Sequence, residues 1–150
     1  LIGQYAHGNE PGHHTIHLYN YVDRPWRTQE LVDSVLQSQY RNAPDGVSGN
    51  EDCGQMSAWY ILNAMGFYQP CPGRPVYSIG RPLFPEVTIH LPGNKTFRIL
   101  TKNNSRQAKY IKSVKLNGKP LRRPFFTHEE LAAGGTLEME MSARPTRWGR

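Results

Sequence analysis

The sequence has few of the features that would assign it at once to a disulfide-rich, metal-binding or membrane class. Its 150 residues include two cysteines, Cys53 and Cys71, which are too few for a disulfide framework and lack the CxxC spacing of a zinc site. A single disulfide and two buried thiols both stay open. The longest apolar stretch falls well short of the ~18 residues that a membrane span needs, and the opening LIGQY has no signal-peptide character. We expect no membrane span, and we place any targeting segment upstream of residue 1.

Basic residues are scarce in the first half of the chain. Residues 1–75 hold four Lys or Arg against seven Asp or Glu, whereas residues 76–150 hold fourteen against five. In the second half basic and apolar residues alternate, as at Arg98, Lys102, Lys112 and Lys115, which is typical of the solvated face of an antiparallel sheet. A surface for nucleic acid or acidic glycan is the alternative, but neither an aromatic-rich RNA-binding motif nor a recognition-helix pattern accompanies the charge. We therefore expect no nucleic-acid partner.

Two helices are predicted in the first half. Over residues 26–40 apolar side chains recur every three or four positions, which indicates a helix with one buried face, and Thr28 is a plausible N-cap. Residues 55–65 are apolar almost all round and are followed by Gly66 in the C-cap position. A helix with so small a polar face should be buried among other helices, so we expect further helices upstream.

After residue 75 the apolar period changes from about 3.6 to 2, which indicates strands. Alternating segments occupy residues 87–91, 97–99, 110–116 and 137–141, and the turn signals PGN (residues 92–94) and NG (residues 117–118) separate some of them. The sequence thus predicts an α+β chain. Its expected units are a helical part over residues 1–75 and a small, sandwich-like antiparallel β unit of four to six strands over residues 76–150.

Two polar loops precede the helices: GNEPGHH (residues 8–14) and GNEDCGQ (residues 49–55). If the helices are neighbours, such loops gather at one end of the scaffold and form a site. Glu51 and Asp52 stand directly before a helix N-terminus, which favours anions. Capping by Asp52 or Asn50 is the simple interpretation; a carboxylate that stays ionised and deprotonates water or binds a cation is the other. Asn50, Glu51, Asp52 and Gln55 offer the hard oxygens that calcium prefers.

The first loop carries an acid and several histidines. In the simple interpretation Glu10 and the histidines satisfy backbone groups in an irregular turn. His13 and His17 are four residues apart, so zinc hydrolysis is an alternative, but the absence of HExxH and the PG at residues 11–12 argue against it. Aromatic residues flank both loops; most should pack in a core, and one or two exposed rings would suit the apolar face of a sugar.

Five motifs in order carry a family resemblance: GNEPGHH (8–14), PWRTQE (25–30), GNEDCGQMSAW (49–59), GFY (66–68) and CPG (71–73). From about residue 3 to residue 141 the chain resembles the C-terminal part of glycoside hydrolase family 92. These enzymes are calcium-dependent, exo-acting α-mannosidases, many of them from gut Bacteroidetes. The resemblance implies the last helices of an (α/α)6 toroid followed by the β unit. An N-terminal β-sandwich and the earlier toroid helices of the same chain would lie upstream.

The resemblance also implies roles for individual residues in an inverting hydrolysis of α-mannosides. Asp52 matches the general base, and Asn50 stands where many members have a second carboxylate, so a two-carboxylate base is in doubt. Asn9, Glu10, His13 and His14 match the substrate-binding neighbourhood, although Asn9 replaces the His common in members that cut α-1,2 linkages. Glu10, Asn50 and Asp52 would be the calcium ligands.

Three further expectations follow from the resemblance. The general acid lies upstream, so residues 1–150 should be inactive alone. The substrate would be a mannose-containing glycan, and the enzyme would be secreted or periplasmic. Two other functions stay open: a β module that binds glycan or another polyanion, and a β unit that only covers the helices.

Overall fold

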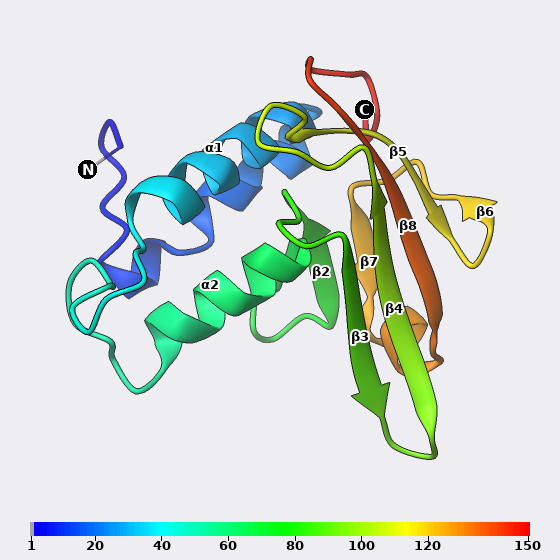
Figure 1. Cartoon of the computed structure of the whole chain (residues 1–150), viewed down its shortest axis with the longest axis horizontal. Coiled ribbons are helices and arrows are strands. Elements are labelled where there is room, and N and C mark those ends of the chain that lie inside the picture. Colours follow the sequence, from blue (N-terminus) through cyan, green and yellow to red (C-terminus); the bar gives the residue numbers. More distant parts are fainter. Residues whose placement is uncertain (1) are drawn as a thin grey trace.

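The computed structural model describes residues 2–150, so that Leu1, the first residue of the LIGQY segment, lies outside the described part. Helices and strands segregate along the chain as the α+β prediction requires (Figure 1). The first half contains η1 (Glu10–Gly12), η2 (Thr15–Val22), α1 (Pro25–Ser38), α2 (Gln55–Met65) and β1 (Phe67–Tyr68). The second half contains β2 (Val76–Ile79), β3 (Glu86–Leu91), β4 (Lys95–Lys102), β5 (Tyr110–Leu116), β6 (Lys119–Pro120), β7 (Phe125–Thr127), α3 (His128–Ala132) and β8 (Gly135–Ser142). Among these residues no helix has the length and apolarity to span a membrane.

Helix α1 confirms the first predicted helix but begins earlier than its expected cap. Pro25 starts it, because proline lacks the N–H that the first helical position leaves unpaired. Thr28 is therefore not an N-cap. It is buried inside the helix, and its hydroxyl donates a hydrogen bond to the carbonyl of Ile16 at 3.0 Å. This bond ties α1 to η2, which leads from the first loop.

Helix α2 confirms the second predicted helix and its glycine cap. Gly66 adopts a left-handed φ of 109°, and its N–H donates to the carbonyls of Leu62 and Asn63. Trp59 is fully buried in a core that α2 shares with α1 and η2, but Ile61 is 54% exposed. Within residues 2–150, therefore, α2 is buried on one side and open on another.

The β unit differs from the prediction in two respects: residues 76–150 contain seven strands, β2 to β8, rather than four to six, and the larger sheet is mixed rather than antiparallel. The strand order is β3-β4-β8-β5-β6, and β8 lies between two strands that precede it in the chain (Figure 1). It pairs parallel to β4 and antiparallel to β5. Alternation shows that a segment is a strand but not which strand lies beside it, and the parallel pair becomes possible because the chain crosses over through β7 and α3.

The β unit and the helices share structure across residue 75. Strand β1, from the first half, pairs with β2, which pairs with β7, in a second sheet. Leu62 and Met65 of α2 pack against the β core, in which Phe97 and Phe126 stack with their ring centroids 5.8 Å apart. The predicted domain boundary itself stays a prediction.

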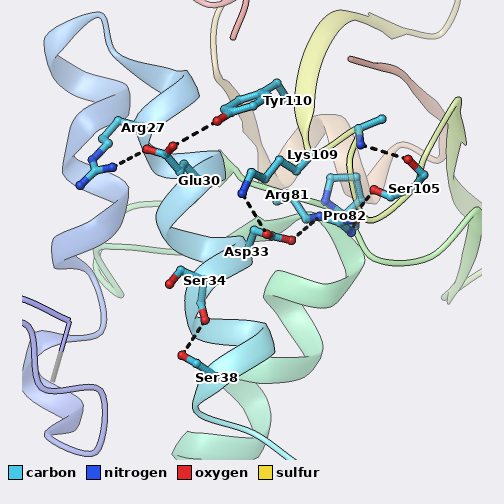
Figure 2. Close-up of polar contacts among 11 residues, drawn as sticks. Arg27, Glu30, Asp33, Ser34, Ser38, Arg81, Pro82, Ser105, Lys109 and Tyr110 are labelled. Atoms are coloured by element: carbon cyan, nitrogen blue, oxygen red, sulfur yellow. Dashed lines mark hydrogen bonds and ion pairs between the residues drawn. The ribbon is translucent and has the colours of Figure 1, made fainter. Parts of the chain in front are cut away.

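A buried ion cluster fastens α1 to the β unit, as Figure 2 shows. Asp33 of α1 lies between the Arg81 guanidinium, 3.0 Å away, and the Lys109 ammonium, 3.4 Å away. One turn earlier, the Tyr110 hydroxyl donates to Glu30 at 3.1 Å. These contacts, together with the shared core, hold α1 and α2 so that their loop ends lie away from the sheet (Figure 1).

Two of the four alternating basic residues of the sheet, Arg98 and Lys112, form ion pairs. Arg98 of β4 bonds Glu86 of β3, and Lys112 of β5 bonds Glu140 of β8, across neighbouring strands. Each partner in these pairs is substantially exposed. The pairing favours the interpretation of these basic residues as a solvated face.

Candidate functional site

The two polar loops contact each other through their backbones, which confirms that they gather at one end of the helices. A Cβ atom placed on Gly8 would lie 2.4 Å from the carbonyl oxygen of Ser48, and one on Gly49 would lie 3.2 Å from the Gly8 Cα. Real Cβ atoms essentially never approach closer than 3.0 Å. The glycine at residue 8 is therefore required for the loops to lie this close.

Two carboxyl groups meet where the loops join. Glu10 begins the short helix η1, and Asp52 lies in the turn before α2. A hydrogen-bonding contact with the Glu10 carboxyl, together with its negative charge, raises the pKa of Asp52 above its ordinary value. One oxygen of Glu10, Oε1, is buried and has no hydrogen-bond partner. An unpartnered buried carboxylate oxygen is costly, so this pair is suited to receive a proton, a hydroxyl group or a cation.

The turn that carries Asp52 has an unusual backbone. Asp52, Cys53 and Gly54 take left-handed φ angles of 46°, 57° and 94° in succession. Non-glycine residues in this region cost of order 1–3 kcal/mol each and cluster at functional sites. The turn separates the Asp52 side chain from the cap of α2.

Glu51, rather than Asp52 or Asn50, caps helix α2. Its carboxylate accepts hydrogen bonds from the backbone N–H groups of Gly54 and Ser57, the second at 3.0 Å. Hydrogen bonding with Ser57 lowers the pKa of Glu51. The expectation that the helix N-terminus favours an anion thus holds for Glu51, whereas the pKa of Asp52 shifts the opposite way because Glu10 is its neighbour.

His13 follows Glu10 by three residues in the first loop and is only 2% exposed. Its Nε2 donates to the carbonyl of His7 at 2.9 Å, and its Nδ1 accepts from the Gln55 amide at 3.0 Å. Burial lowers the pKa of His13, consistent with a neutral ring. Both ring nitrogens are therefore occupied within the protein, and a direct contact between this ring and substrate does not fit the geometry.

His7 is a buried residue that the sequence analysis did not single out. The Tyr5 hydroxyl donates to its Nδ1 at 2.8 Å, and its Nε2 donates to the Tyr40 hydroxyl at 2.5 Å. Tyr40 in turn donates to the carbonyl of Met56 in α2 at 2.9 Å. Burial lowers the pKa of His7 to about 4. The only signal in the sequence was the density of histidines around the first loop.

His17 belongs to a separate buried network. Its Nδ1 accepts from the Ser78 hydroxyl at 3.0 Å, and its Nε2 donates to Asn63 at 2.9 Å. Burial lowers the pKa of His17 to about 4. His13 and His17 thus do not share a ligand position, and residues 2–150 contain no group of three or more His, Cys, Asp or Glu side chains that could hold a metal ion.

The remaining predicted residues lie on the surface. Asn9, His14 and Asn50 are exposed, so their side chains are open to a ligand. Cys53 and Cys71 are both free and exposed, so the two thiols are neither paired nor buried. A cavity of about 790 Å³ opens beside Tyr40, Tyr60 and Glu51, but neither Glu10 nor Asp52 lines it. The carboxyl pair, rather than this cavity, defines the candidate site.

Comparison with known proteins places this arrangement in a family. The sequence model of the glycosyl hydrolase family 92 catalytic domain matches residues 1–143. The chain is 39% identical to a family GH92 alpha-mannosidase of Bacteroides thetaiotaomicron, whose structure it matches with a TM-score of 0.93 over 98% of this chain and 20% of that one. It is 46% identical to a family GH92 inverting mannosidase of Bacteroides thetaiotaomicron VPI-5482, with a TM-score of 0.90 over 97% of this chain and 20% of that one.

A curated relative agrees. A protein of Arthroderma benhamiae described as an uncharacterized secreted glycosidase is 33% identical over 145 residues, which are 95% of this chain and 19% of the relative. The chain spans about a fifth of the length of these relatives. The chain belongs to glycosyl hydrolase family 92.

Proposed function

We propose, from membership of glycosyl hydrolase family 92, that the chain forms part of an α-mannosidase that removes terminal mannose from glycans with inversion. The observation that carries the proposal is the close approach of the two loops at Gly8 and Gly49, which brings the Glu10 and Asp52 carboxyls near enough to interact. The relatives described as mannosidases support the substrate class. The matched part would be the last helices of an (α/α)6 toroid and the β unit beside them.

In this proposal Asp52 is the general base. A general base works best when its pKa lies near the operating pH, and the neighbouring Glu10 raises the pKa of Asp52 in that direction. Asn50 is exposed in the same loop, and its amide can hydrogen-bond the attacking water but cannot accept its proton at neutral pH. A single carboxylate therefore carries the base role. Exposed Asn9 and His14 would contact the sugar.

Glu10 is not the general acid that pairs with this base. The acid and base carboxyls of inverting glycosidases stand roughly 6.5–9.5 Å apart, which leaves room for the water between them. The side-chain interaction with Glu10 that raises the pKa of Asp52 requires the two carboxyls to lie closer together than this spacing. The acid is thus supplied from outside residues 1–150, and these residues alone should not hydrolyse α-mannosides.

Calcium fits the donor chemistry of the loops. Glu10 Oε1 is buried without a partner, and Glu10, Asn50 and Asp52 offer carboxylate and amide oxygens of the kind that calcium takes. Calcium takes about 6–8 oxygens, so waters, sugar hydroxyl groups or upstream residues would complete the set. When bound, the ion would hold sugar hydroxyls and favour a ring distorted toward the oxocarbenium-like transition state.

The test uses the full-length polypeptide that carries this sequence and an aryl α-mannoside. Asp52→Asn should lower kcat by about 10²–10⁴-fold, the usual contribution of a general base, with little change in thermal stability. Asp23→Asn is the matched control, because Asp23 also takes a left-handed φ, 57°, but lies outside both loops. Full activity of Asp52→Asn would contradict the role of Asp52, and hydrolysis by residues 1–150 alone would contradict the external acid.

The location of the enzyme is part of the proposal. The Arthroderma benhamiae relative is described as secreted, and the substrate is a glycan, which secreted and periplasmic enzymes encounter. Export of the full-length polypeptide can be tested by fractionation of the source cells, and a purely cytosolic location would contradict it.

A further inference from the structure

We propose that His13 and Gln55 form a buried positioning pair that fixes the distance between the carboxyl groups of Glu10 and Asp52. The inference rests on the proposed function, because it concerns the geometry of the same site. His13 would then support the site rather than contact the sugar. Gln55, the first residue of helix α2, would support it from the second loop.

The two loops are built alike at this point. The N–H of His13 donates to the carbonyl of Glu10 at 2.9 Å, and the N–H of Gln55 donates to the carbonyl of Asp52 at 3.2 Å. In each loop, the residue three positions after the carboxyl residue donates its backbone N–H to the backbone carbonyl of that carboxyl residue. The side chains of those two residues then bond to each other, from Gln55 Nε2 to His13 Nδ1, at 3.0 Å.

This bond has no counterpart elsewhere between the loops. Apart from the interaction between the Glu10 and Asp52 carboxyls themselves, it is the one hydrogen bond among residues 2–150 that joins residues 8–14 directly to residues 49–55. The other direct link is the backbone approach at Gly8, which is a van der Waals contact. The His13–Gln55 bond is therefore the directional link that sets how the loops lie relative to each other.

The surrounding hydrogen bonds hold both members in one orientation. Because His13 Nε2 donates to the His7 carbonyl, its Nδ1 must present a lone pair to Gln55. The Gln55 amide also donates to the Tyr68 hydroxyl at 3.2 Å. The Trp59 indole donates to the carbonyl of His13 at 3.2 Å. The pair is thus rigid, as a support for catalytic groups must be.

Positioning matters here because the supported groups repel each other. Two carboxylates in contact move apart unless the scaffold holds them together, and the Glu10 Oε1 atom is already buried without a partner. Loss of the His13–Gln55 bond should let the loops separate. A displacement of about 1 Å can cost about 10²-fold in rate.

Two substitutions of His13 separate positioning from general stability. In His13→Asn the amide takes the place of Nδ1 and can still accept from Gln55, whereas in His13→Gln it takes the place of Nε2 and can still donate to the His7 carbonyl. Each variant thus keeps one of the two ring hydrogen bonds. Gln55→Met removes the donor but keeps the length of the side chain. This variant tests the same hydrogen bond if His13→Gln does not fold.

The experiment measures kcat, KM and thermal unfolding of the full-length polypeptide with an aryl α-mannoside. Positioning predicts that His13→Gln and Gln55→Met lose about 10²-fold in kcat at nearly unchanged KM, while His13→Asn loses less than about tenfold. Equal losses in the two His13 variants, in step with their unfolding temperatures, would overturn the inference. An inactive wild type would contradict the proposed function but not the positioning role. Crystal structures would then test that role: an intact Glu10–Asp52 contact in His13→Gln would overturn it, and a broken contact would support it.

Discussion

The substitution Gly8→Ala tests whether the close approach of the two loops creates the site. The added Cβ would lie 2.4 Å from the Ser48 carbonyl oxygen and 3.2 Å from its carbon, against a practical limit of 3.0 Å. The obstacle is backbone, which cannot rotate away as a side chain can. The loops must therefore separate by at least about 0.6 Å, the difference between the contact and that limit.

The separation should affect activity more than stability. Overpacking of this kind costs about 1–3 kcal/mol, so the unfolding temperature should fall only modestly. Because the carboxyls of Glu10 and Asp52 lie on opposite sides of the junction, a shift approaching 1 Å should lower kcat/KM by up to about 10²-fold.

Gly12→Ala is the matched control, because its added Cβ would lie 3.9 Å from the nearest atom, in the Tyr5 ring, an ordinary contact. Both variants are compared with the wild type by calorimetry and by aryl α-mannoside hydrolysis in the full-length polypeptide. Gly12→Ala should keep nearly full activity. A Gly8→Ala protein with wild-type activity and unfolding temperature would refute the conclusion that residue 8 must be glycine for the site to form.

Three further predictions concern the scaffold. Asp33→Ala should lower the free energy of unfolding by about 3–5 kcal/mol, because it leaves the Arg81 guanidinium, whose side chain is 4% exposed, without its counter-charge. The control Glu86→Ala, which breaks the exposed pair with Arg98, should cost less than about 1 kcal/mol. Equal losses of the two variants in urea unfolding would contradict this prediction. His17 has a pKa lowered from 6.5 to about 4, so the unfolded chain takes up the proton first. The contribution of His17 to stability should fall by about 3 kcal/mol as the pH drops from 6.5 to 4, in addition to that of His7, whose pKa is also lowered to about 4. His17→Gln should therefore reduce the pH slope, and an unchanged slope would show that His17 is not responsible. Glu51 has a lowered pKa, so its contribution is complete above the ordinary value of 4.5 and is lost as the pH falls through the lower folded value; Glu51→Gln should therefore unfold at a lower temperature than the wild type at pH 7, with the gap closing in acid.

The sequence was sufficient for the features that depend on local pattern. The periodicity of apolar residues located α1 and α2, and Gly66 ends α2 as predicted because only a residue tolerant of positive φ fits there. The NG turn also formed, with Asn117 and Gly118 both at positive φ. The meeting of the two loops was predicted from their places before neighbouring helices.

The features that the sequence could not predict depend on contacts between residues far apart in the chain. Neither the mixed sheet nor the ion cluster has a local signal: Asp33 looks like an ordinary polar residue on a helix, and its partner Arg81 lies 48 positions later. The cap of α2 was expected from Asp52 or Asn50, but Glu51 provides it, because adjacent acids look equivalent in sequence and the left-handed turn that distinguishes them has no clear signal there. His13 was expected near substrate because the family resemblance covers the whole GNEPGHH motif, whereas its ring bonds to Gln55 and its carbonyl to Trp59, both in α2.

The central place of β8 in the sheet has a consequence for how the chain is made. Strands β4 and β5 are synthesised first but do not pair with each other. Strand β8, some twenty residues or more downstream of both, lies between them and bonds to each. Until residues 135–142 leave the ribosome, the facing edges of β4 and β5 have unpaired N–H and carbonyl groups, which favour association with other chains. The five-stranded sheet can therefore close only after β8 has been synthesised, so a premature stop before residue 135 should yield a chain prone to aggregation rather than a smaller folded unit.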